Sequence, residues 1–316
     1  MQQGKTNTKI AGIDVGKAWL DVAVHGEAQT LRVKNDVDGV SELIAWLGGH
    51  EVGRVGLEAS GGYEKLACSS LGQGGFEMVL HQPMEVRLFA RLRRLRAKND
   101  RLDAALIAAA TAQVDRVKAL ADPRLQELGE RLTAYEQISD QAAELKVFME
   151  HVSLSDVARL LKAQIGSLEQ AKAKLAADIT RRLKAHLDLA RRLALLQSLP
   201  GVGPIVGASL VIRMPELGSM KRGQAAALVG VAPYDRDSGK TRGHRTIGGG
   251  RRRPRRMLYL AAMAAKRSCP DLKHFAAQLA ARGKPPKLIA VAVMRKLIEA
   301  ANLVLSRNQP WTAKPV

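Results

Sequence analysis

The sequence predicts a mixed α/β domain at its N-terminal end, followed by a long helical segment and a mainly helical C-terminal region. Three observations predict this fold class. Short apolar segments separated by turn residues fill residues 9–80. Apolar residues recur at helical spacing between Pro123 and Pro200, with no proline between them, and a loop rich in glycine and arginine interrupts the C-terminal region.

The first region contains five predicted strands and two predicted helices. Strands are expected at 9–15, 18–24, 28–34, 54–59 and 76–80, and helices at 36–47 and 63–71. The first three strands should form a meander, because only tight glycine or polar turns separate them. Asp36 is placed to cap the first helix. The order βββαβαβ is that of the ribonuclease H-like fold, so we expect a mixed sheet with helices.

The rest of the chain is predicted to be mainly helical. A basic helix is expected at 83–96, and another begins at 99–100. Between residues 123 and 199 the spacing of leucines predicts two long helices that break near 152–155. We expect a coiled-coil arm through which the chain self-associates; an ordinary helical bundle packed on the first domain is the alternative. The predicted domains are 8–114, 115–196 and 197–316.

The chain is strongly basic. It has 50 Lys and Arg against 30 Asp and Glu, a net charge of +20 and a sequence pI near 10.3. Such a charge attracts phosphate backbones and releases their counterions, so nucleic acid is the expected partner. Cys68 and Cys269 form no CxxC pair, which excludes a disulfide framework and a zinc finger. Any metal would therefore be bound by oxygen ligands.

Two further classes are disfavoured by composition. Only 3% of the residues are aromatic, so stacking of bases on exposed rings is not expected as the main binding mode. The sequence has no apolar run of about 18 residues, the length that crosses a membrane, and its N-terminus has no signal-peptide core. We therefore expect a cytoplasmic protein without a membrane partner.

Four acidic residues occupy places where a nuclease of this fold binds metal. Asp14 ends the first strand, and Glu58 ends the fourth strand, which lies beside the first in this fold. Asp100 and Asp103 are three positions apart, so they lie on one face of a helix. Carboxylate oxygens in this arrangement suit Mg²⁺ or Mn²⁺, which assist in-line phosphoryl transfer.

Each of these residues also has a structural interpretation. Asp14 is a turn former, and Glu58 is a solvent-facing strand end. Asp100 caps a helix, and Asp103 favours the helix dipole. Actin-like kinases open with the same Asp-x-Gly hairpin, but the later candidate for their second phosphate loop, 237–239, has no strand-rich region around it. The coincidence of strand order and acidic positions favours the metal site.

A hydroxyl group stands in the most basic loop of the chain, at 234–245. Ser238 lies there among cationic side chains that could clamp a scissile phosphate while the serine attacks it. A hydrogen bond from Ser238 to a phosphate, without attack, is the alternative, and Tyr234 is a second candidate nucleophile. The Gly-Lys-Thr at 239–241 imitates a P-loop, but Tyr234 stands where that motif needs glycine, so nucleotide binding is excluded.

Two basic clusters and one glycine turn predict the nucleic-acid surface. The clusters lie at 87–101 and 236–256; a solvated basic face is the alternative. The Gly-Val-Gly turn at 201–203 looks like a helix-hairpin-helix element, whose backbone N–H groups bind a DNA phosphate without reading sequence, and a plain turn between helices is the alternative. The predicted contact residues are Arg87, Arg91, Arg94, Lys98, Gly201, Gly203, Arg236, Lys240, Arg242, His244, Arg245, Arg251, Arg252 and Arg253.

Over nearly its whole length, the chain resembles the insertion sequence 110 family of DEDD transposases, which includes DNA invertases of the Piv type. The motifs that carry the resemblance lie at 12–17, 56–61, 98–104, 199–203, 230–234, 238–239 and 248–251. The resemblance implies a RuvC-like N-terminal domain, a coiled-coil arm and a C-terminal transposase domain. It also implies dimers that assemble into tetramers.

The resemblance further implies roles for individual residues. Asp14, Glu58, Asp100 and Asp103 would be the metal-binding tetrad. Ser238 would form a phosphoserine link to DNA, and the serine of one subunit would complete the RuvC-like site of another. A structured bridge RNA is implied as a guide that pairs with donor and target DNA. The protein would then be bacterial and associated with the nucleoid.

We therefore expect a DNA recombinase that acts on the ends of a mobile element and on target DNA. A site-specific invertase of the Piv type is one alternative enzyme. A RuvC-like nuclease that recognises DNA structure and uses water is another. Outside the enzymes, the alternative is an architectural protein that binds nucleic acid without cutting it.

Overall fold

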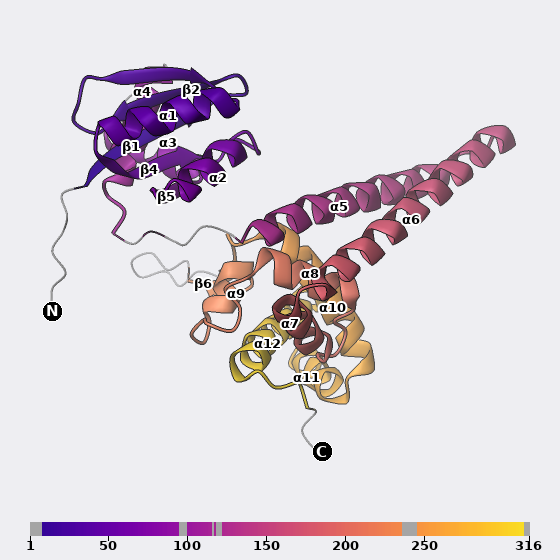
Figure 1. The fold of residues 1–316 in the computed structure, drawn as a ribbon. Coiled ribbons are helices and arrows are strands. Elements are labelled where there is room, and N and C mark those ends of the chain that lie inside the picture. Colours follow the sequence, from indigo (N-terminus) through magenta and orange to yellow (C-terminus); the bar gives the residue numbers. More distant parts are fainter. Residues whose placement is uncertain (1–7, 95–99, 116, 118–121, 236–244, 313–316) are drawn as a thin grey trace. The chain divides into compact units, whose positions relative to one another are not determined.

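The computed structural model describes residues 8–94, 100–115, 117, 122–235 and 245–312, and no side-chain detail for 100–102. The chain divides into two compact units, Met1–Ala121 and Asp122–Val316. Figure 1 shows a sheet with helices in the first unit and helices almost throughout the second. Among the described residues, no helix is both long enough and apolar enough to cross a membrane.

The first unit contains a five-stranded mixed sheet, as predicted. Its strands are β1 (Lys9–Val15), β2 (Trp19–Val24), β3 (Thr30–Lys34), β4 (Val52–Glu58) and β5 (Glu77–His81). Their order in the sheet is β3-β2-β1-β4-β5. The meander β1–β2–β3 is antiparallel, whereas β4 runs parallel to β1 and β5 parallel to β4. The predicted element order βββαβαβ is confirmed.

Helices cover both faces of this sheet. They are α1 (Val37–Gly49), α2 (Lys65–Gln73), α3 (Pro83–Leu92) and α4 (Asp100–Thr111). The predicted cap is present, because the Asp36 side chain accepts a hydrogen bond from the backbone N–H of Gly39 at 2.9 Å. The basic helix was expected to reach residue 96, which is wrong. It ends at Leu92, and Arg94 has a φ of 56°, a left-handed conformation that cannot continue a helix.

One face of the sheet packs on α1 and α2 through a conventional apolar core. Ile13 and Leu57 in the central strands are fully buried there, together with Leu43 and Leu47 of α1 and Leu71 of α2. Successive side chains of a strand point to opposite faces. The residues that alternate with Ile13 and Leu57 therefore point to the other face, which α4 covers.

α4 packs closely on the sheet because the strands beneath it carry small residues. In register across β2, β1 and β4 lie Ala23, Gly12 and Gly56. A Cβ atom at Gly12 would stand 2.2 Å from the backbone nitrogen of Ala108, and one at Gly56 would stand 1.8 Å from Oγ1 of Thr111. Gly12 therefore cannot be replaced without moving the helix backbone, and a larger residue at Gly56 would displace the Thr111 side chain.

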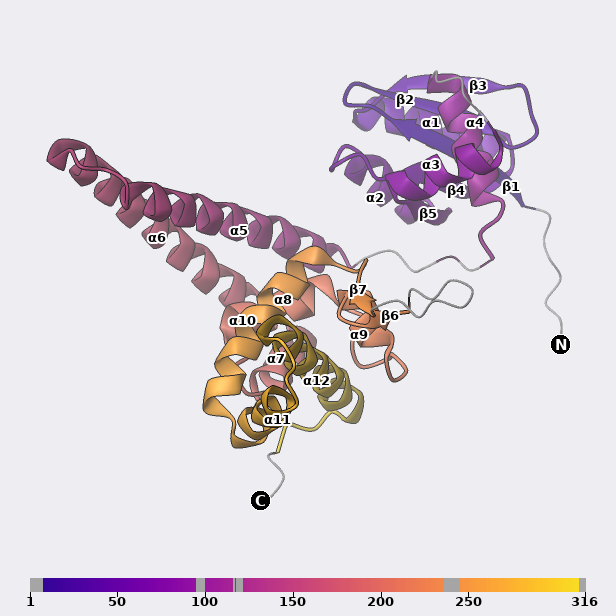
Figure 2. The same cartoon turned by 180° about the vertical axis from the view of Figure 1, so that it is seen from behind.

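The second unit begins with two long helices, α5 (Pro123–Met149) and α6 (Ser155–Lys184), as predicted. They run antiparallel as a hairpin, which both views show (Figures 1 and 2). The second helix was expected to continue to residue 199, which is wrong. His186 has an extended backbone (φ −113°, ψ 118°) that ends the run, and a separate helix begins at Leu187, whose side chain is 90% exposed.

The rest of the second unit is mainly helical, as predicted. Its elements are α7 (Leu187–Gln197), α8 (Pro204–Arg213), α9 (Gln224–Val229), β6 (Pro233–Tyr234), β7 (Thr246–Ile247), α10 (Arg252–Ser268), α11 (Pro270–Ala281) and α12 (Pro286–Arg307). Leu132 of α5 and Leu183 of α6 are buried in one core with Leu193, Leu258 and Ile298 of these helices. The base of the α5–α6 hairpin is therefore built into this helical unit.

Candidate functional site

The sheet register places a row of polar residues across four strands. Asp14 of β1 lies directly opposite Asp21 of β2. The parallel register of β1 with β4 makes Asp14 and Glu58 neighbours, and Glu58 pairs with His81 of β5. Two of the predicted acidic residues, Asp14 and Glu58, thus lie side by side at the carboxyl ends of two parallel strands.

This row faces α4. Residues two positions apart on a strand share a face of the sheet. Asp14 lies two residues after Gly12, and Glu58 lies two residues after Gly56. Since α4 lies against both glycines, Asp14 and Glu58 are on the face of the sheet that the helix covers.

The direction of α4 brings its first turn to the same end of the sheet. The last turn of α4 lies over Gly56. After the helix ends, the carbonyl of Val114 accepts a hydrogen bond of 2.9 Å from the guanidinium of Arg54, which lies nearer the start of β4 than Gly56 does. In both views the end of α4 lies beside the start of β1 (Figures 1 and 2). The start of α4, which carries Asp100 and Asp103, therefore lies towards the carboxyl ends of β1 and β4.

The four predicted carboxylates are brought towards one end of the sheet by the backbone. Asp103 is half-buried, and the Asp100 side chain lies outside the described residues. Among the described side chains, no three His, Cys, Asp or Glu are grouped closely enough to hold a metal ion. The donor atoms of Asp14, Glu58 and Asp103 are nevertheless all oxygens, which fits a hard divalent ion such as Mg²⁺ or Mn²⁺.

Asp21 and His81 are members of the row that were not predicted from the sequence. Asp21 is 8% exposed and forms an ion pair with Arg32 at 3.3 Å, and the Arg32 guanidinium lies over the ring of Trp19. Asp21 is the one charged residue in an otherwise apolar strand, a signal that could have identified it. His81 has a weaker signal, since it merely ends the last strand of the sheet.

The side chain of His81 forms a hydrogen bond with Thr111 of α4. Oγ1 of Thr111 donates to the carbonyl of Ile107 at 2.7 Å, so Nε2 of His81, 2.9 Å from that oxygen, is the donor between the two side chains. Burial lowers the pKa of His81, and nearby Glu85 offsets only part of this effect. A neutral His81 fastens β5 to α4 and is not a metal ligand through Nε2.

The predicted serine loop lies mostly outside the described residues. Ser238 and the predicted contacts Lys98, Arg236, Lys240, Arg242 and His244 are among the residues that the structure does not describe. The ends of the loop are described: β6 and β7 pair Pro233 with Ile247 and Tyr234 with Thr246. The two strands bring the ends of the loop together. Arg245 at one end forms an ion pair with Asp235 at the other.

The predicted contact arginines after this loop differ in what they bind. Arg251 donates to the Glu216 carboxylate at 2.7 Å, and Arg253 donates to Glu136 at 3.0 Å. Arg252 is exposed and has no ion pair or side-chain hydrogen bond within the described part of the chain. Of these three side chains, Arg252 is therefore the one open to a phosphate without breaking an internal pair.

The remaining predicted contacts lie on α3, just after it, and in the turn before α8. The side chains of Arg87, Arg91 and Arg94 are exposed. Gly201 has a φ of 74°, and a Cβ atom there would stand 2.3 Å from the Ala261 carbonyl of α10, so packing alone requires glycine. Gly203, just before α8, has open space around it. Its position leaves the first turn of α8 accessible to a ligand.

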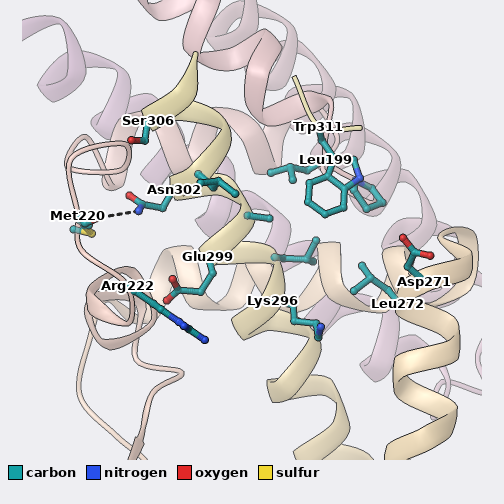
Figure 3. A pocket seen from close by; sticks show the side chains of 14 residues that line it. Leu199, Met220, Arg222, Asp271, Leu272, Lys296, Glu299, Asn302, Ser306 and Trp311 are labelled. Carbon is teal, nitrogen blue, oxygen red and sulfur yellow. Dashed lines mark hydrogen bonds between the residues drawn. The ribbon is translucent and has the colours of Figure 1, made fainter. Parts of the chain in front are cut away.

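A cavity of about 680 Å³ lies in the second unit. Its walls include Leu199, Leu272 and Trp311 (Figure 3). Two carboxylates line it, but Figure 3 shows Asp271 and Glu299 on opposite sides, not pointing at each other. The cavity therefore lacks the neighbouring carboxylates that distinguish the first unit.

Two family models match the chain. A transposase model for the DEDD proteins of the IS110 group matches residues 11–153. A second, described as transposase IS116/IS110/IS902 family, matches residues 193–277. Among curated proteins, the pilin gene-inverting proteins of Moraxella bovis and Moraxella lacunata are each 25% identical to the chain over 321 residues, covering 95% of it and 96% of the relative.

Two solved structures of RuvC match a part of the chain. One is the Thermus thermophilus RuvC structure, 17% identical, with a TM-score of 0.29. The other is T. thermophilus RuvC in complex with a Holliday junction substrate, 16% identical, with the same TM-score. Each match covers 36% of this chain and 100% of the other.

Proposed function

Because the chain belongs to the IS110 family of DEDD transposases, we propose that it cleaves and exchanges DNA strands at the ends of a mobile element and in target DNA. The observation that carries this proposal is the register of the sheet. It makes Asp14 and Glu58 neighbours on the face beneath α4, whose first turn carries Asp100 and Asp103. The strand order β3-β2-β1-β4-β5 further supports a ribonuclease H-like, RuvC-like assignment of the first unit.

The four acidic residues would hold the divalent metal on which a DEDD transposase depends. Mg²⁺ or Mn²⁺ bound by their oxygens would stabilise the charge that develops on the phosphate during transfer. The protein supplies the fixed spacing. Gly12 and Gly56 let α4 approach the strands closely, and this close approach holds its first turn near the ends of β1 and β4.

Ser238 is the proposed nucleophile. Its hydroxyl oxygen would form a bond to phosphorus while the bond from phosphorus to a deoxyribose oxygen breaks, which leaves a free hydroxyl on the DNA and a phosphoserine link on the protein. A deoxyribose hydroxyl of another strand would then reverse the step and join the strands. The ion pair of Arg245 with Asp235 and the pairing of β6 with β7 support a loop held at both ends.

DNA binding is proposed to use the exposed cations, and among the predicted contacts with described side chains these are Arg87, Arg91, Arg94 and Arg252. The net charge of +20 supports a polyanionic partner, and a structured guide RNA would be held by the same charge. The open N-terminus of α8 after Gly203 suits a backbone contact to phosphate.

Self-association is proposed through the α5–α6 hairpin. Towards its far end, Val147, Phe148, Leu154 and Leu160 are exposed. Apolar side chains on two antiparallel helices would be buried if a second copy packed against them. The resulting dimers, paired into tetramers, would let the serine of one subunit complete the carboxylate site of another. Such a protein would act on the bacterial nucleoid in the cytoplasm.

Site-specific inversion is the second candidate, and the pilin gene-inverting relatives favour it. The chemistry at phosphorus would be the same, and the arrangement of the DNA sites would decide the product. Recombination on two plasmids separates the candidates. A mobile-element recombinase joins element ends to a target, whereas an invertase reverses a segment between inverted sites.

Substitutions test the enzyme against the two remaining alternatives. With Mg²⁺ and element-end DNA, Asp14→Ala and Glu58→Ala should abolish strand exchange but keep DNA binding in a gel-shift assay. An architectural protein predicts unchanged phenotypes for both. Ser238→Ala should remove a covalent protein–DNA band from a denaturing gel; a nuclease that uses water predicts cleavage without such a band in the wild type.

A further inference from the structure

Asn35 joins the two loops that follow Asp14 and Glu58. Its Nδ2 group donates hydrogen bonds to the carbonyl oxygens of Gly16 at 2.9 Å and of Tyr63 at 3.0 Å. Gly16 lies two residues after Asp14, and Tyr63 lies five residues after Glu58. One side-chain amide therefore ties the chain after one acidic residue to the chain after the other.

Asn35 is itself held in place by the sheet. It follows the last residue of β3, and its backbone N–H donates to the carbonyl of Ala18 at 2.9 Å. The turn between β1 and β2 is closed by a hydrogen bond from the N–H of Gly16 to the carbonyl of Trp19, also at 2.9 Å. The backbone of Asn35 is thus anchored to Ala18, and its side-chain amide binds a turn that has its own closing hydrogen bond.

The loop after Glu58 is fixed by a second side chain. The Glu64 carboxylate accepts hydrogen bonds from the N–H and hydroxyl of Ser60, at 3.1 and 2.9 Å, and from the N–H of Gly62 at 2.8 Å. Burial raises the pKa of Glu64, but a hydrogen bond from its own backbone N–H, together with those from Gly62 and Ser60, outweighs this effect and holds the pKa below its ordinary value. The Tyr63 carbonyl is therefore a defined anchor for Asn35.

The orientation of the Asn35 amide follows from its partners. Two carbonyl oxygens can only accept hydrogen bonds, so the NH₂ group must face them. Oδ1 of Asn35 is then buried, with no hydrogen-bond partner among the described residues. A buried oxygen without a partner reduces stability. This cost offsets part or all of the stability that the two hydrogen bonds provide, so a role in geometry is the better reason for the arrangement.

We propose that Asn35 is a positioning residue: the sheet register makes Asp14 and Glu58 neighbours, and Asn35 holds them there by tying together the loops that follow them. The inference rests on the proposed function, in which both carboxylates bind one divalent metal site. If the amide is lost, β1 and β4 stay paired, but the loops after them are no longer tied to each other, and the carboxylates at the two strand ends gain freedom to move. Removing a group that is hydrogen-bonded directly to a metal ligand typically weakens metal affinity by about 10- to 100-fold. Asn35 acts one step further out, through the carbonyls of Gly16 and Tyr63, so we expect an effect at the lower end of this range.

Binding of Mn²⁺ to the full-length protein tests this role. MnCl₂ is titrated while the electron paramagnetic resonance signal of free Mn²⁺ is followed, and melting temperatures are recorded alongside. Asn35→Ala should bind Mn²⁺ at least about tenfold more weakly than the wild type. Asn35→Ser, which cannot span both carbonyls, should do the same and serves if the alanine variant does not fold.

Asp36→Ala is the matched control. Asp36 is the next residue in the chain, and its side chain caps α1 by accepting from the N–H of Gly39. It takes no part in the hydrogen bonds that join the two loops. Its loss should lower the melting temperature and leave Mn²⁺ affinity unchanged. An equal loss of affinity in Asp36→Ala and Asn35→Ala overturns the positioning role, because lower stability would then account for both.

Asp14→Ala separates failure of the inference from failure of the function. If Asp14→Ala loses Mn²⁺ binding while Asn35→Ala binds like the wild type, the positioning role is overturned and the metal site stands. If Asp14→Ala binds Mn²⁺ like the wild type, the metal site is overturned, and the role of Asn35 with it.

Discussion

Gly12 is the residue on which the approach of α4 to the sheet depends most directly. A Cβ atom there would meet the backbone of two positions of α4, at 2.2 Å from the Ala108 nitrogen and 2.3 Å from the Ala104 oxygen. Backbone atoms of a packed helix cannot rotate away as a side chain does. The helix that carries Asp100 and Asp103 would therefore have to shift as a whole.

Gly12→Ala should destabilise the protein by about 1 to 3 kcal/mol, the usual effect of overpacking. Gly48→Ala is its control, because Gly48 lies in α1 with nothing within 4 Å of an added Cβ atom. That change should stabilise the protein by up to about 1 kcal/mol, since alanine favours helix more than glycine. Urea denaturation measures both; a neutral Gly12→Ala would contradict the close packing of α4.

Single residues also show where reasoning from the sequence ends. Asp14 and Glu58 could be selected because they end predicted strands. Asp21 carries only the signal of a single charge in an apolar strand, and the sequence does not say that it lies opposite Asp14. Asn35 carries no signal, because its importance depends on which carbonyls it meets. Those contacts are set by strand register and loop geometry, which a pattern of apolar residues does not specify.

At the scale of elements, Glu136 connects α5 to α8 and α10. Its carboxylate accepts hydrogen bonds from Arg213 and from Arg253, each at 3.0 Å. The Glu136 and Arg213 side chains are only 11% and 17% exposed. Burial raises the pKa of Glu136, and the two arginines offset part of that rise.

Glu136→Ala should lower the free energy of unfolding by about 3 kcal/mol, because Arg213 stays buried without its carboxylate partner. Asp140→Ala is the matched change one helical turn later. It breaks the more exposed ion pair with Arg256 and should cost less than about 1 kcal/mol. Urea denaturation of the two variants measures both losses of unfolding free energy. A larger loss for Asp140→Ala than for Glu136→Ala would contradict the prediction.

The hairpin itself carries an ion pair between its two helices. Lys146 of α5 donates to Glu169 of α6 at 2.7 Å, and Lys172 also pairs with Glu169. The hydrogen bonds from Lys146 and Lys172 lower the pKa of Glu169 from 4.5 to about 2. A carboxyl group whose pKa is lower in the folded state than in the unfolded state stabilises the fold at pH values above its unfolded-state pKa. This stabilisation is lost as the pH falls towards the folded-state pKa.

An NMR titration of the Glu169 carboxyl should therefore have its midpoint near pH 2 in the wild type. Lys146→Ala removes the first of the two donors and should move the midpoint upwards, towards 4.5. A wild-type midpoint at 4.5, with no effect of Lys146→Ala, would mean that the two helices are not joined by this pair in solution.

The order of elements was largely predictable, whereas some of their ends were not. Periodic apolar residues specify the five strands and the break between α5 and α6, because burial of one face selects them. The end of α6 at Lys184 and of α3 at Leu92 depends on local backbone conformations at His186 and Arg94. Neither residue is a proline or glycine, so the sequence contains no clear stop signal there.

At the scale of the whole molecule, the proposal requires two units of the chain to act on one phosphodiester. The carboxylate row belongs to the first unit, and Ser238 belongs to the second. If the serine of one protomer completes the site of another, Asp14→Ala and Ser238→Ala should each be inactive alone. A mixture of the two should regain strand exchange, because a mixed dimer contains one complete site.

A mixture that stays inactive, although mixed dimers form, would place both groups in the same protomer. Pull-down through a tag on one variant confirms that mixed dimers are present. A mixture of Asp14→Ala with Glu58→Ala is the control. It should remain inactive, because both substitutions damage the same carboxylate site.

In the proposed mechanism, carboxylates of the first unit and the serine of the second act on the same DNA bond. Mass spectrometry of DNA-linked peptides after reaction with element-end DNA and Mg²⁺ detects this chemistry on the serine itself. We predict a nucleotide attached to Ser238 in the wild type and none in Asp14→Ala. Cleaved DNA with no nucleotide on Ser238, or an unchanged Ser238 adduct in Asp14→Ala, would rule the mechanism out.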